Sequence, residues 1–385
     1  MKKIRYITDV LQLTQVPIEQ RRMLKKVTRK FAFRANDYYL SLIDWSNEDD
    51  PIRRIIVPNE GELIPWGKLD ASKEAHYAKA VGLEHKYPDT ALLLVNNICG
   101  GFCRFCFRKR LFMNGDSKVT HNISPNLQYI RNHPEISNVL LSGGDPLIMS
   151  TKKLESFIQR IRCIEHVKII RIGTKMPAFN PYRITEDPSL TEMLSRYSLP
   201  QKRIHIMTNF NHPRELTPIS IDAITRLLEA GTVVINQTPL IRGVNDDPDI
   251  LAELFRSLSF MGISSYYVFQ CRPTLGNRIY AVPVAESYEI FRKARMQVSG
   301  LAGTARFIMS HSTGKIEVAG TTPEHIYMQY HRSASPGNAS QFMVFKINKD
   351  AYWFDDFLKT SMNTDQAISY RWLSRMEKNE RQSIK

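Results

Sequence analysis

From about residue 91 onward, short apolar runs alternate with longer segments whose apolar residues recur every three to four positions. The apolar runs predict buried strands at 91–95, 138–141, 167–172, 204–208, 233–237, 266–270 and 306–309. The helical spacing predicts helices that include 153–161, 219–230, 250–260 and 285–298. Alternation over about 220 residues favours parallel βα units with right-handed connections. We therefore expect an α/β fold with a full or partial (β/α) barrel.

The regions on either side of this alternation have different patterns. Residues 1–80 are rich in charge and in helix-forming residues, which predicts an N-terminal helical region. Beyond about residue 320 the alternation stops. There, 342–346 and 351–354 have the pattern of a short β-pair, and the polar end of the chain has helical character. We expect a catalytic domain at 81–320, followed by an extension at 321–385 that serves oligomerisation or acts as a lid.

Polar and glycine-rich residues follow the predicted strands at the point where each strand ends. They are Asn96-Asn97, Ser142-Gly143-Gly144-Asp145, Gly173-Thr174, Thr208-Asn209, Gln237-Thr238 and Gln270-Cys271-Arg272. The carboxyl ends of parallel strands meet at one edge of the sheet, where α/β enzymes place their active sites. The sequence therefore predicts a functional site at the mouth of the barrel.

Composition narrows the class of protein. No apolar run approaches the roughly 20 residues that span a bilayer, and the charged N-terminus lacks the apolar region of a signal peptide. We expect a cytoplasmic protein with no membrane partner. The formal net charge of +15 would suit nucleic acid, yet the basic residues are dispersed and no RNA-binding motif accompanies them. We interpret the charge as a soluble basic surface.

Three of the five cysteines lie close together, in Cys99-Gly-Gly-Phe-Cys103-Arg-Phe-Cys106 directly after the first predicted strand. An odd cysteine count with such a cluster favours a metal or redox site over a disulfide framework. Three thiolates can hold three irons of a [4Fe–4S] cluster and leave the fourth iron open to a ligand. A zinc site is the alternative, with His121 as a possible fourth ligand. We interpret the two other cysteines, Cys163 and Cys271, as packed thiols.

The cysteine spacing, the aromatic Phe105 and the position after the first strand resemble the radical S-adenosylmethionine (SAM) superfamily. The segment Ser142-Gly143-Gly144-Asp145, after the next strand, resembles the superfamily's SAM-binding glycine segment, although a tight turn would have the same composition. The resemblance implies that SAM binds the open iron. Its reduction then yields a deoxyadenosyl radical that abstracts hydrogen from a substrate.

Further segments resemble the lysine 2,3-aminomutase family in the same order along the chain. They are His85-Lys-Tyr-Pro-Asp89, Cys103-Arg-Phe-Cys-Phe-Arg108, Leu140-Leu-Ser-Gly-Gly-Asp145, Arg171-Ile-Gly173, Asn209-Phe-Asn-His-Pro213 and Asn236-Gln237 through Arg242-Gly-Val-Asn-Asp246. The resemblance covers about residues 80 to 320. It implies a partial barrel of radical SAM type and a shift of the amino group from Cα to Cβ of an amino acid.

The resemblance also implies pyridoxal 5′-phosphate (PLP) as a second cofactor. The lysine that holds PLP matches Lys315, in Ser310-His-Ser-Thr-Gly-Lys315, where we expect nearby backbone N–H groups to face the phosphate. A solvated turn is the alternative for this segment. Lys86 and Tyr87 match the phosphate side and Gln237 a further cofactor position, while Thr90 stands where the family has a second basic residue. Arg108 matches the arginine that binds the substrate α-carboxylate.

The expected substrate pocket departs from that of the lysine enzyme. The family's lysine enzyme holds the distal ammonium with two aspartates. Here the first position is Arg272, and the second falls near the apolar Ile308 or Met309. A buried ammonium beside an arginine would be strongly disfavoured. We expect an acidic substrate, glutamate first, paired with Arg272; an Arg272 turned outward into another ion pair is the alternative.

The leading hypothesis is therefore a PLP-dependent 2,3-aminomutase that acts on an acidic amino acid. A radical SAM enzyme of the same family that acts on another amino acid, lysine included, or on a macromolecule without an amino shift, is the second hypothesis. A cluster-containing regulatory or nucleic-acid-binding protein is the third, and it would leave Arg108 and Ser142 without a role. The partners we expect are a small amino acid, an electron donor such as flavodoxin or ferredoxin, and a second copy of the chain.

Overall fold

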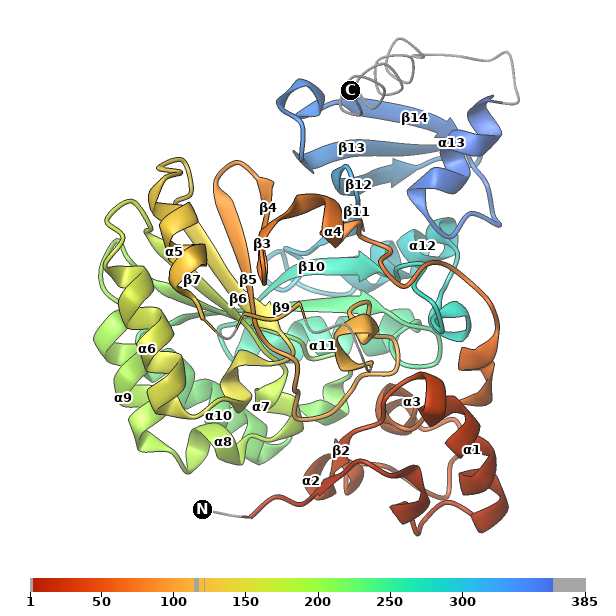
Figure 1. Cartoon of the computed structure of the whole chain (residues 1–385). Helices are drawn as coiled ribbons and strands as arrows, with labels where there is room; N and C mark the ends of the chain where they lie inside the picture. Colours follow the sequence, from red (N-terminus) through yellow and green to blue (C-terminus); the bar gives the residue numbers. More distant parts are fainter. Residues whose placement is uncertain (1–2, 114–117, 121, 363–385) are drawn as a thin grey trace.

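The computed structural model describes residues 3–113, 118–120 and 122–362. Its central feature is a twelve-stranded sheet in the order β14-β13-β12-β11-β10-β9-β8-β7-β6-β5-β4-β3, in which each strand pairs with its neighbours in sequence (Figure 1). The sheet stays open because its order ends at β14 and β3. Among the described residues, no helix is long and apolar enough to cross a bilayer.

The seven predicted strands form the parallel part of the sheet. They are β5 (Thr90–Asn96), β6 (Asn138–Gly143), β7 (Ile169–Gly173), β8 (Ile204–Thr208), β9 (Val233–Leu240), β10 (Ser264–Gln270) and β11 (Arg306–His311). Each pairs in parallel with the next. The expected α/β fold is confirmed, and because the barrel does not close, it is a partial barrel.

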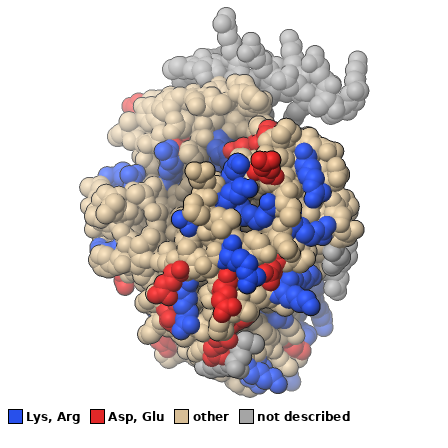
Figure 2. All heavy atoms as spheres, turned by 90° about the vertical axis from the view of Figure 1, so that its left-hand side faces the viewer, with Lys and Arg blue, Asp and Glu red and all other residues tan. Residues whose placement is uncertain are grey.

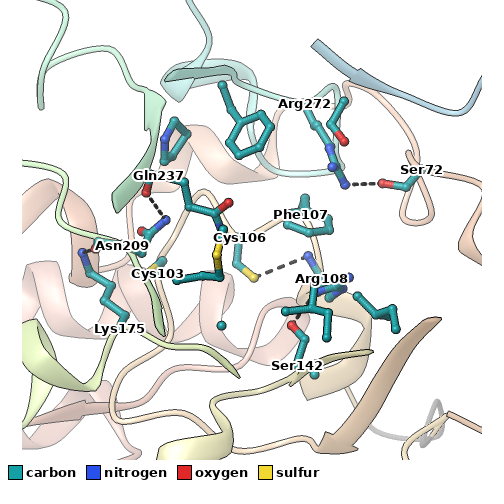
Figure 3. Close-up of a pocket in the computed structure, with 18 of the residues that line it drawn as sticks. Ser72, Cys103, Cys106, Phe107, Arg108, Ser142, Lys175, Asn209, Gln237 and Arg272 are labelled. Atoms are coloured by element: carbon teal, nitrogen blue, oxygen red, sulfur yellow. Dashed lines mark hydrogen bonds between the residues drawn. The ribbon is translucent and has the colours of Figure 1, made fainter. Parts of the chain in front are cut away.

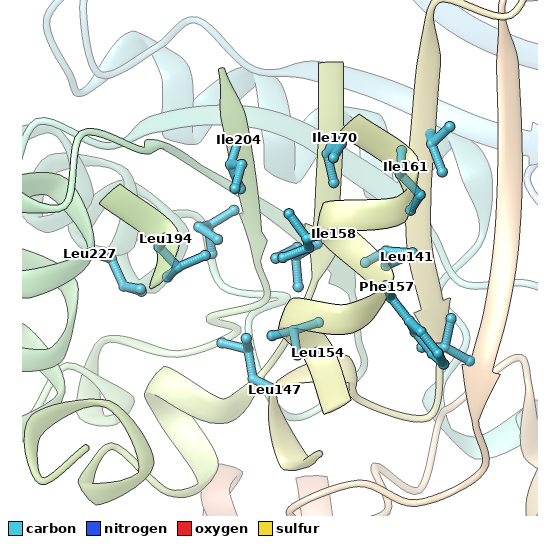
Figure 4. Close-up of a cluster of buried hydrophobic side chains, with 14 of the residues drawn as sticks. Leu141, Leu147, Leu154, Phe157, Ile158, Ile161, Ile170, Leu194, Ile204 and Leu227 are labelled. Carbon is cyan, nitrogen blue, oxygen red and sulfur yellow. The ribbon is translucent and has the colours of Figure 1, made fainter. Parts of the chain in front are cut away.

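Helices connect these strands. They are α5 (Ser124–Arg131), α6 (Thr151–Arg162), α7 (Met176–Phe179), α8 (Tyr182–Thr185), α9 (Pro188–Tyr197), α10 (Pro218–Glu229), α11 (Pro248–Phe260) and α12 (Val284–Met296). The apolar stripe of α6, which includes Leu154 and Ile158, packs onto Leu141 and Ile170 of the sheet (Figure 4). The apolar positions that recur with helical spacing in α6 and those of the buried strands therefore form one hydrophobic core. Cys163, at the end of α6, lies outside that stripe and is exposed, so its expected packing was wrong.

Antiparallel strands extend both edges of the sheet. At one edge, β4 (Leu83–Tyr87) pairs with β5, and β3 (Ala78–Ala80) pairs with β4. At the other edge, β12 (Gly314–Thr321) pairs with β11, and β13 (His325–Ser333) and β14 (Phe342–Lys346) come after it. The long β12–β13 hairpin escaped the sequence analysis. The expected β-pair was half wrong, because 342–346 pairs with β13 and 351–354 leads into α13 (Phe354–Met362). The Asp356 carboxylate accepts the Tyr352 and Trp353 amides there, which starts a helix. The predicted helical end beyond 362 lies outside the described residues.

The N-terminal region contains four helices, α1 (Ile18–Lys30), α2 (Asp37–Leu40), α3 (Pro51–Ile56) and α4 (Glu74–Tyr77), joined by turns and loops. The short strands β1 (Tyr6–Ile7) and β2 (Ala35–Asn36) form a second small sheet. Apolar residues of this region share a core with Phe105 and Phe179. The N-terminal region therefore packs against the cysteine loop (Figure 1).

Basic and acidic side chains are interspersed on the face of the molecule in Figure 2. Several basic residues of the helices are paired with acids, as in Arg196–Glu155 and Arg226–Asp222. Exposed pairs of this kind contribute little to stability.

Candidate active site

A cavity of about 380 Å³ lies at the carboxyl ends of the parallel strands. Strand-end residues line it in series, namely Ser142, Gly173, Asn209, Gln237 and Gln270. Asn209, which follows β8, donates from Nδ2 to the carbonyl of Gln237 within β9 at 2.9 Å (Figure 3). The cavity thus lies where the sequence predicts a functional site, at the carboxyl ends of the parallel strands.

The three clustered cysteines border this cavity together. The Arg108 amide donates to the Cys106 sulfur at 3.4 Å (Figure 3), a contact that stabilises a thiolate. Burial raises the pKa of the Cys103 thiol to about 12, so a nearby cation is needed for it to ionise at neutral pH. Among the described residues, no three His, Cys, Asp or Glu side chains form a group that could hold a single metal ion. His121 lies outside these residues.

The N-terminal region fixes the cysteine loop from outside. Arg34 donates from Nε to the carbonyl of Cys99 at 2.8 Å, and the buried Asn36 donates from Nδ2 to the carbonyl of Gly100 at the same distance. Arg104, between the second and third cysteines, forms a buried ion pair with Glu62. The loop is thereby preorganised by residues that precede it by about 40 to 65 positions.

The glycine segment after β6 adopts a conformation that requires glycine. Gly143 has φ +118°, a region that L side chains rarely adopt, and a Cβ on Gly144 would lie 2.2 Å from the carbonyl oxygen of Ile98. The Gly144 and Asp145 amides donate to the carbonyls of Asn96 and Ile98, each at 2.7 Å. The segment is therefore a close backbone crossing beside the cysteine loop, more specific than an ordinary turn.

Asp145 has a structural environment that its motif does not reveal. Its carboxylate accepts the Thr174 hydroxyl at 2.8 Å and the Lys175 amide at 2.7 Å. Burial raises the pKa of Asp145 to about 6, against the lowering effect of these donors. The Asp145 side chain thus joins the ends of β6 and β7, and the backbone of the segment lines the cavity.

Arg108 borders the cavity but is not free. Its Nε donates to Glu74 at 2.9 Å and its Nη1 to the Ser142 hydroxyl at 2.8 Å, while Arg110 also binds Glu74. Within the described part of the chain, Nη2 of Arg108 makes no hydrogen bond. The guanidinium is held rigidly, with one nitrogen left for a ligand.

Arg272 points into the cavity and does not turn outward. Its Nη1 donates to the Ser72 hydroxyl, and its guanidinium lies 3.8 Å from the centroid of the Phe107 ring (Figure 3). It forms no ion pair with any described carboxylate. Burial lowers the pKa of Arg272 to about 10. The charge of Glu74, the next largest effect, acts in the opposite direction and raises it. The alternative of an outward ion pair is excluded.

Lys315 lies on β12, opposite Arg332 of β13, and its side chain lines the cavity. Its Nζ sits 5.0 Å from the ring centroid of Tyr267 and 4.8 Å from that of Phe269. Burial, and then the charges of Arg272 and other cations, hold the pKa of Lys315 well below its usual range. The expectation of free backbone donors was wrong at Thr313, whose amide donates to His311 Nδ1 at 3.2 Å.

Cations surround Lys315 on the side where the sequence predicted the phosphate. Lys86 donates to the carbonyl of His311 at 2.5 Å, and burial together with Arg272 lowers the pKa of Lys86 to about 7. Tyr87 and Thr90 also border the cavity, as expected. Arg171 and Arg332, which β7 and β13 contribute, line it as well. They supply the positive charge that Thr90 does not.

Several cavity residues received no role from the sequence. They are Ser72, Glu74, Glu84, Lys175, Tyr267, Phe269 and Arg332. Most come from the antiparallel edges of the sheet or from loops, where no motif marks them. Ile308 and Met309 are fully buried in the core and outside the cavity lining, whereas Ser310 lines the cavity. At the two positions where the family's lysine enzyme has aspartates, this chain has no carboxylate. Cys271 is buried, as expected.

The sequence of this chain is similar to those of known radical SAM enzymes and aminomutases. Residues 93–255 match the model of the Radical SAM superfamily. The putative L-lysine 2,3-aminomutase of Aquifex aeolicus is 54% identical over 96% of this chain and 99% of its own length. The L-lysine 2,3-aminomutase of Fusobacterium nucleatum is 35% identical (87% and 76% covered), and the glutamate 2,3-aminomutase of Clostridioides difficile is 33% identical (77% and 70%).

The fold, the cysteine loop and this match define a radical SAM enzyme. Such enzymes use a [4Fe–4S] cluster and SAM. The sequence identity to the relatives and the length over which they match define the family more narrowly: the chain belongs to the lysine 2,3-aminomutase family. The activity of this class is that of an aminomutase, an isomerase that moves an amino group within its substrate.

Proposed function

We propose that this protein is a PLP-dependent 2,3-aminomutase whose substrate is an acidic amino acid, glutamate first. The observation that carries the proposal is that two buried basic residues, Lys315 and Arg272, line the same cavity. Lys315 is a buried amine in a field of cations, and Arg272 is a buried guanidinium without a carboxylate partner among the described residues. The first suits a covalent bond to a carbonyl cofactor, and the second suits an anionic substrate.

The cysteine loop supports the radical part of the reaction. Cys99, Cys103 and Cys106 would hold the cluster, because three thiols face one cavity in a loop fixed by Arg34 and Asn36. The backbone of 142–145 would contact SAM beside it. When bound, the cluster and SAM supply the radical that removes a hydrogen atom from Cβ of the substrate. An acidic flavodoxin or ferredoxin would provide the electron.

The second half of the cavity supports the amino shift. Lys315 would hold PLP, and the cations Lys86, Arg171 and Arg332 with Tyr87 would bind its phosphate. When bound, PLP supplies the conjugated ring that stabilises the migrating nitrogen. Burial and neighbouring cations lower the pKa of Lys315, which favours the neutral amine, the nucleophilic form. Gln237, within β9, would contact a cofactor.

Two arginines would orient the substrate. Arg108 is held by Glu74 and Ser142 with Nη2 available for the α-carboxylate. Arg272, stacked on Phe107, would bind the side-chain carboxylate. Fixed charges of this kind place the substrate without reorganisation.

The test uses reconstituted, anaerobic protein with SAM, PLP and dithionite, supplied with L-glutamate or L-lysine. We expect β-glutamate and no β-lysine by mass spectrometry. Borohydride reduction should fix PLP on Lys315, as shown by peptide mapping. Lys315→Ala should lose that adduct, whereas the exposed control Lys293→Ala should keep it. Arg272→Asp should lose β-glutamate formation, and retention of full turnover by this variant would contradict the substrate assignment.

L-Lysine is the second candidate substrate, because the Aquifex and Fusobacterium relatives carry that name. β-Lysine as the main product would keep the aminomutase and overturn the role of Arg272. Accumulation of 5′-deoxyadenosine without either β-amino acid would favour a radical SAM enzyme with another substrate. A normal product yield from protein without PLP would overturn the cofactor assignment.

A further inference from the structure

Glu84 is the one carboxylate bordering the cavity that has no hydrogen-bonding or ion-pairing partner within the described residues. Glu74 is bound by Arg108 and Arg110, and Asp145 is bound by Thr174 and Lys175. The proposed function assigns work to the cations of the cavity and none to Glu84. A half-buried polar side chain without a partner calls for an explanation.

The fold aims Glu84 at the same space as the proposed substrate groups. It lies on β4 opposite Leu92 of β5, and both residues line the cavity. Lys86, two residues further along β4, also lines it. The alternation of strand side chains places Glu84 and Lys86 on one face. Glu84 therefore faces the cavity directly.

The charges around Glu84 determine its protonation. Burial first, and then the carboxylate of Glu74, raise the pKa of Glu84 to about 8. Asp70 acts in the same direction, while Arg108 and Arg110 oppose it. Both arginines, however, form their ion pairs with Glu74, whose pKa is lowered. Lys86 and Arg272 also interact with Glu84 and favour its ionised form. With burial and Glu74 as the larger effects, the protonated form of Glu84 is favoured, whereas Glu74 stays ionised between its two arginines.

We propose that Glu84 is a substrate-binding residue that acts as a neutral acid and donates a hydrogen bond to a carboxylate of the amino-acid substrate. This inference rests on the proposed function, since it needs an amino acid in the cavity. A neutral carboxyl group near Arg108 and Arg272 adds a further donor to those of the two guanidinium groups without adding a negative charge. An ionised Glu84 would instead repel the substrate.

The test measures equilibrium binding of L-glutamate by calorimetry to the PLP-loaded protein, together with steady-state KM, between pH 6.5 and 9. For the wild type, Kd and KM should rise about tenfold above pH 8 as Glu84 loses its proton. Glu84→Gln, which donates at every pH, should bind as tightly as the wild type at pH 7 and lose this rise. Glu84→Ala should bind about tenfold more weakly at pH 7.

L-Glutamine separates the two carboxylates of the substrate. The same pH effect with L-glutamine would assign the hydrogen bond to the α-carboxylate, and an effect confined to L-glutamate would assign it to the side chain. An identical pH profile in the wild type and Glu84→Gln would overturn the inference. If Glu84→Gln lost binding of L-lysine but not of L-glutamate, Glu84 would be a ligand of an ammonium group, and the inference would also be overturned. A wild type without any β-amino acid product would instead contradict the proposed function.

Discussion

Arg104 and Glu62 form a bidentate ion pair whose two hydrogen bonds measure 2.9 and 2.8 Å, with the arginine side chain 2% exposed and the glutamate fully buried. Arg104 stands inside the cysteine loop, and Glu62 belongs to the N-terminal region. Lys109 and Tyr280 lie against the same carboxylate. One buried anion thus connects the loop to its scaffold.

Removing that anion should unfold the loop. Glu62→Gln leaves a buried arginine without its counter-charge, and we expect a loss of about 3–5 kcal/mol in the free energy of unfolding. Denaturant titration measures this loss, and iron content after reconstitution should fall with it. The exposed Glu60→Gln is the control, with a change within about 0.5 kcal/mol. Unchanged stability in Glu62→Gln would contradict a structural role for the pair.

The proposed cluster ligands give a second prediction. Serine at Cys99, Cys103 or Cys106 removes a soft thiolate ligand, so each variant should lose most of the bound iron and the charge-transfer absorbance of the reconstituted protein. The exposed Cys163→Ser should retain both. Full retention of four irons by any of the three variants would remove that cysteine from the ligand set.

Gly144→Ala tests the close backbone crossing. The new Cβ would lie 2.2 Å from the carbonyl oxygen of Ile98, so the backbone must shift at an expected cost of about 1–3 kcal/mol. SAM affinity, measured by calorimetry on the reconstituted protein, should fall as well. Gly320→Ala is the matched control, because a Cβ there meets no atom within 4 Å. Equal SAM affinity in the two variants would contradict a role for the segment in SAM binding.

The cation field around Lys315 predicts a pH effect. Arg272 is the largest of the charges that lower the pKa of Lys315, so Arg272→Gln should raise that pKa. The neutral, reactive amine would then form only at higher pH, and the midpoint for PLP adduct formation, followed by absorbance, should shift upward. The exposed Arg292→Gln should leave the midpoint unchanged. A downward shift in Arg272→Gln would contradict the electrostatic account.

Local pattern was enough for the framework of the fold. The seven parallel strands and the helices between them follow from periodicity, because a buried strand and an amphipathic helix each leave a mark on adjacent residues. The β12–β13 hairpin escaped because strands on an antiparallel edge mix apolar and polar positions. The segment 351–354 misled the sequence analysis because aromatic residues suit a strand as well as the start of a buried helix.

The sequence by itself determined the cysteine loop, the glycine segment and the candidate residues Lys315, Arg108 and Arg272, since each belongs to a short motif or to an ordered resemblance. Only the tertiary structure decided the state of these groups. It tied Arg108 to Glu74, gathered Arg171 and Arg332 around Lys315, and gave Arg272 and Glu84 no ionic partner within the part of the chain that it describes. Charge and burial depend on neighbours that the sheet brings together from distant parts of the chain, and no local pattern encodes those distances.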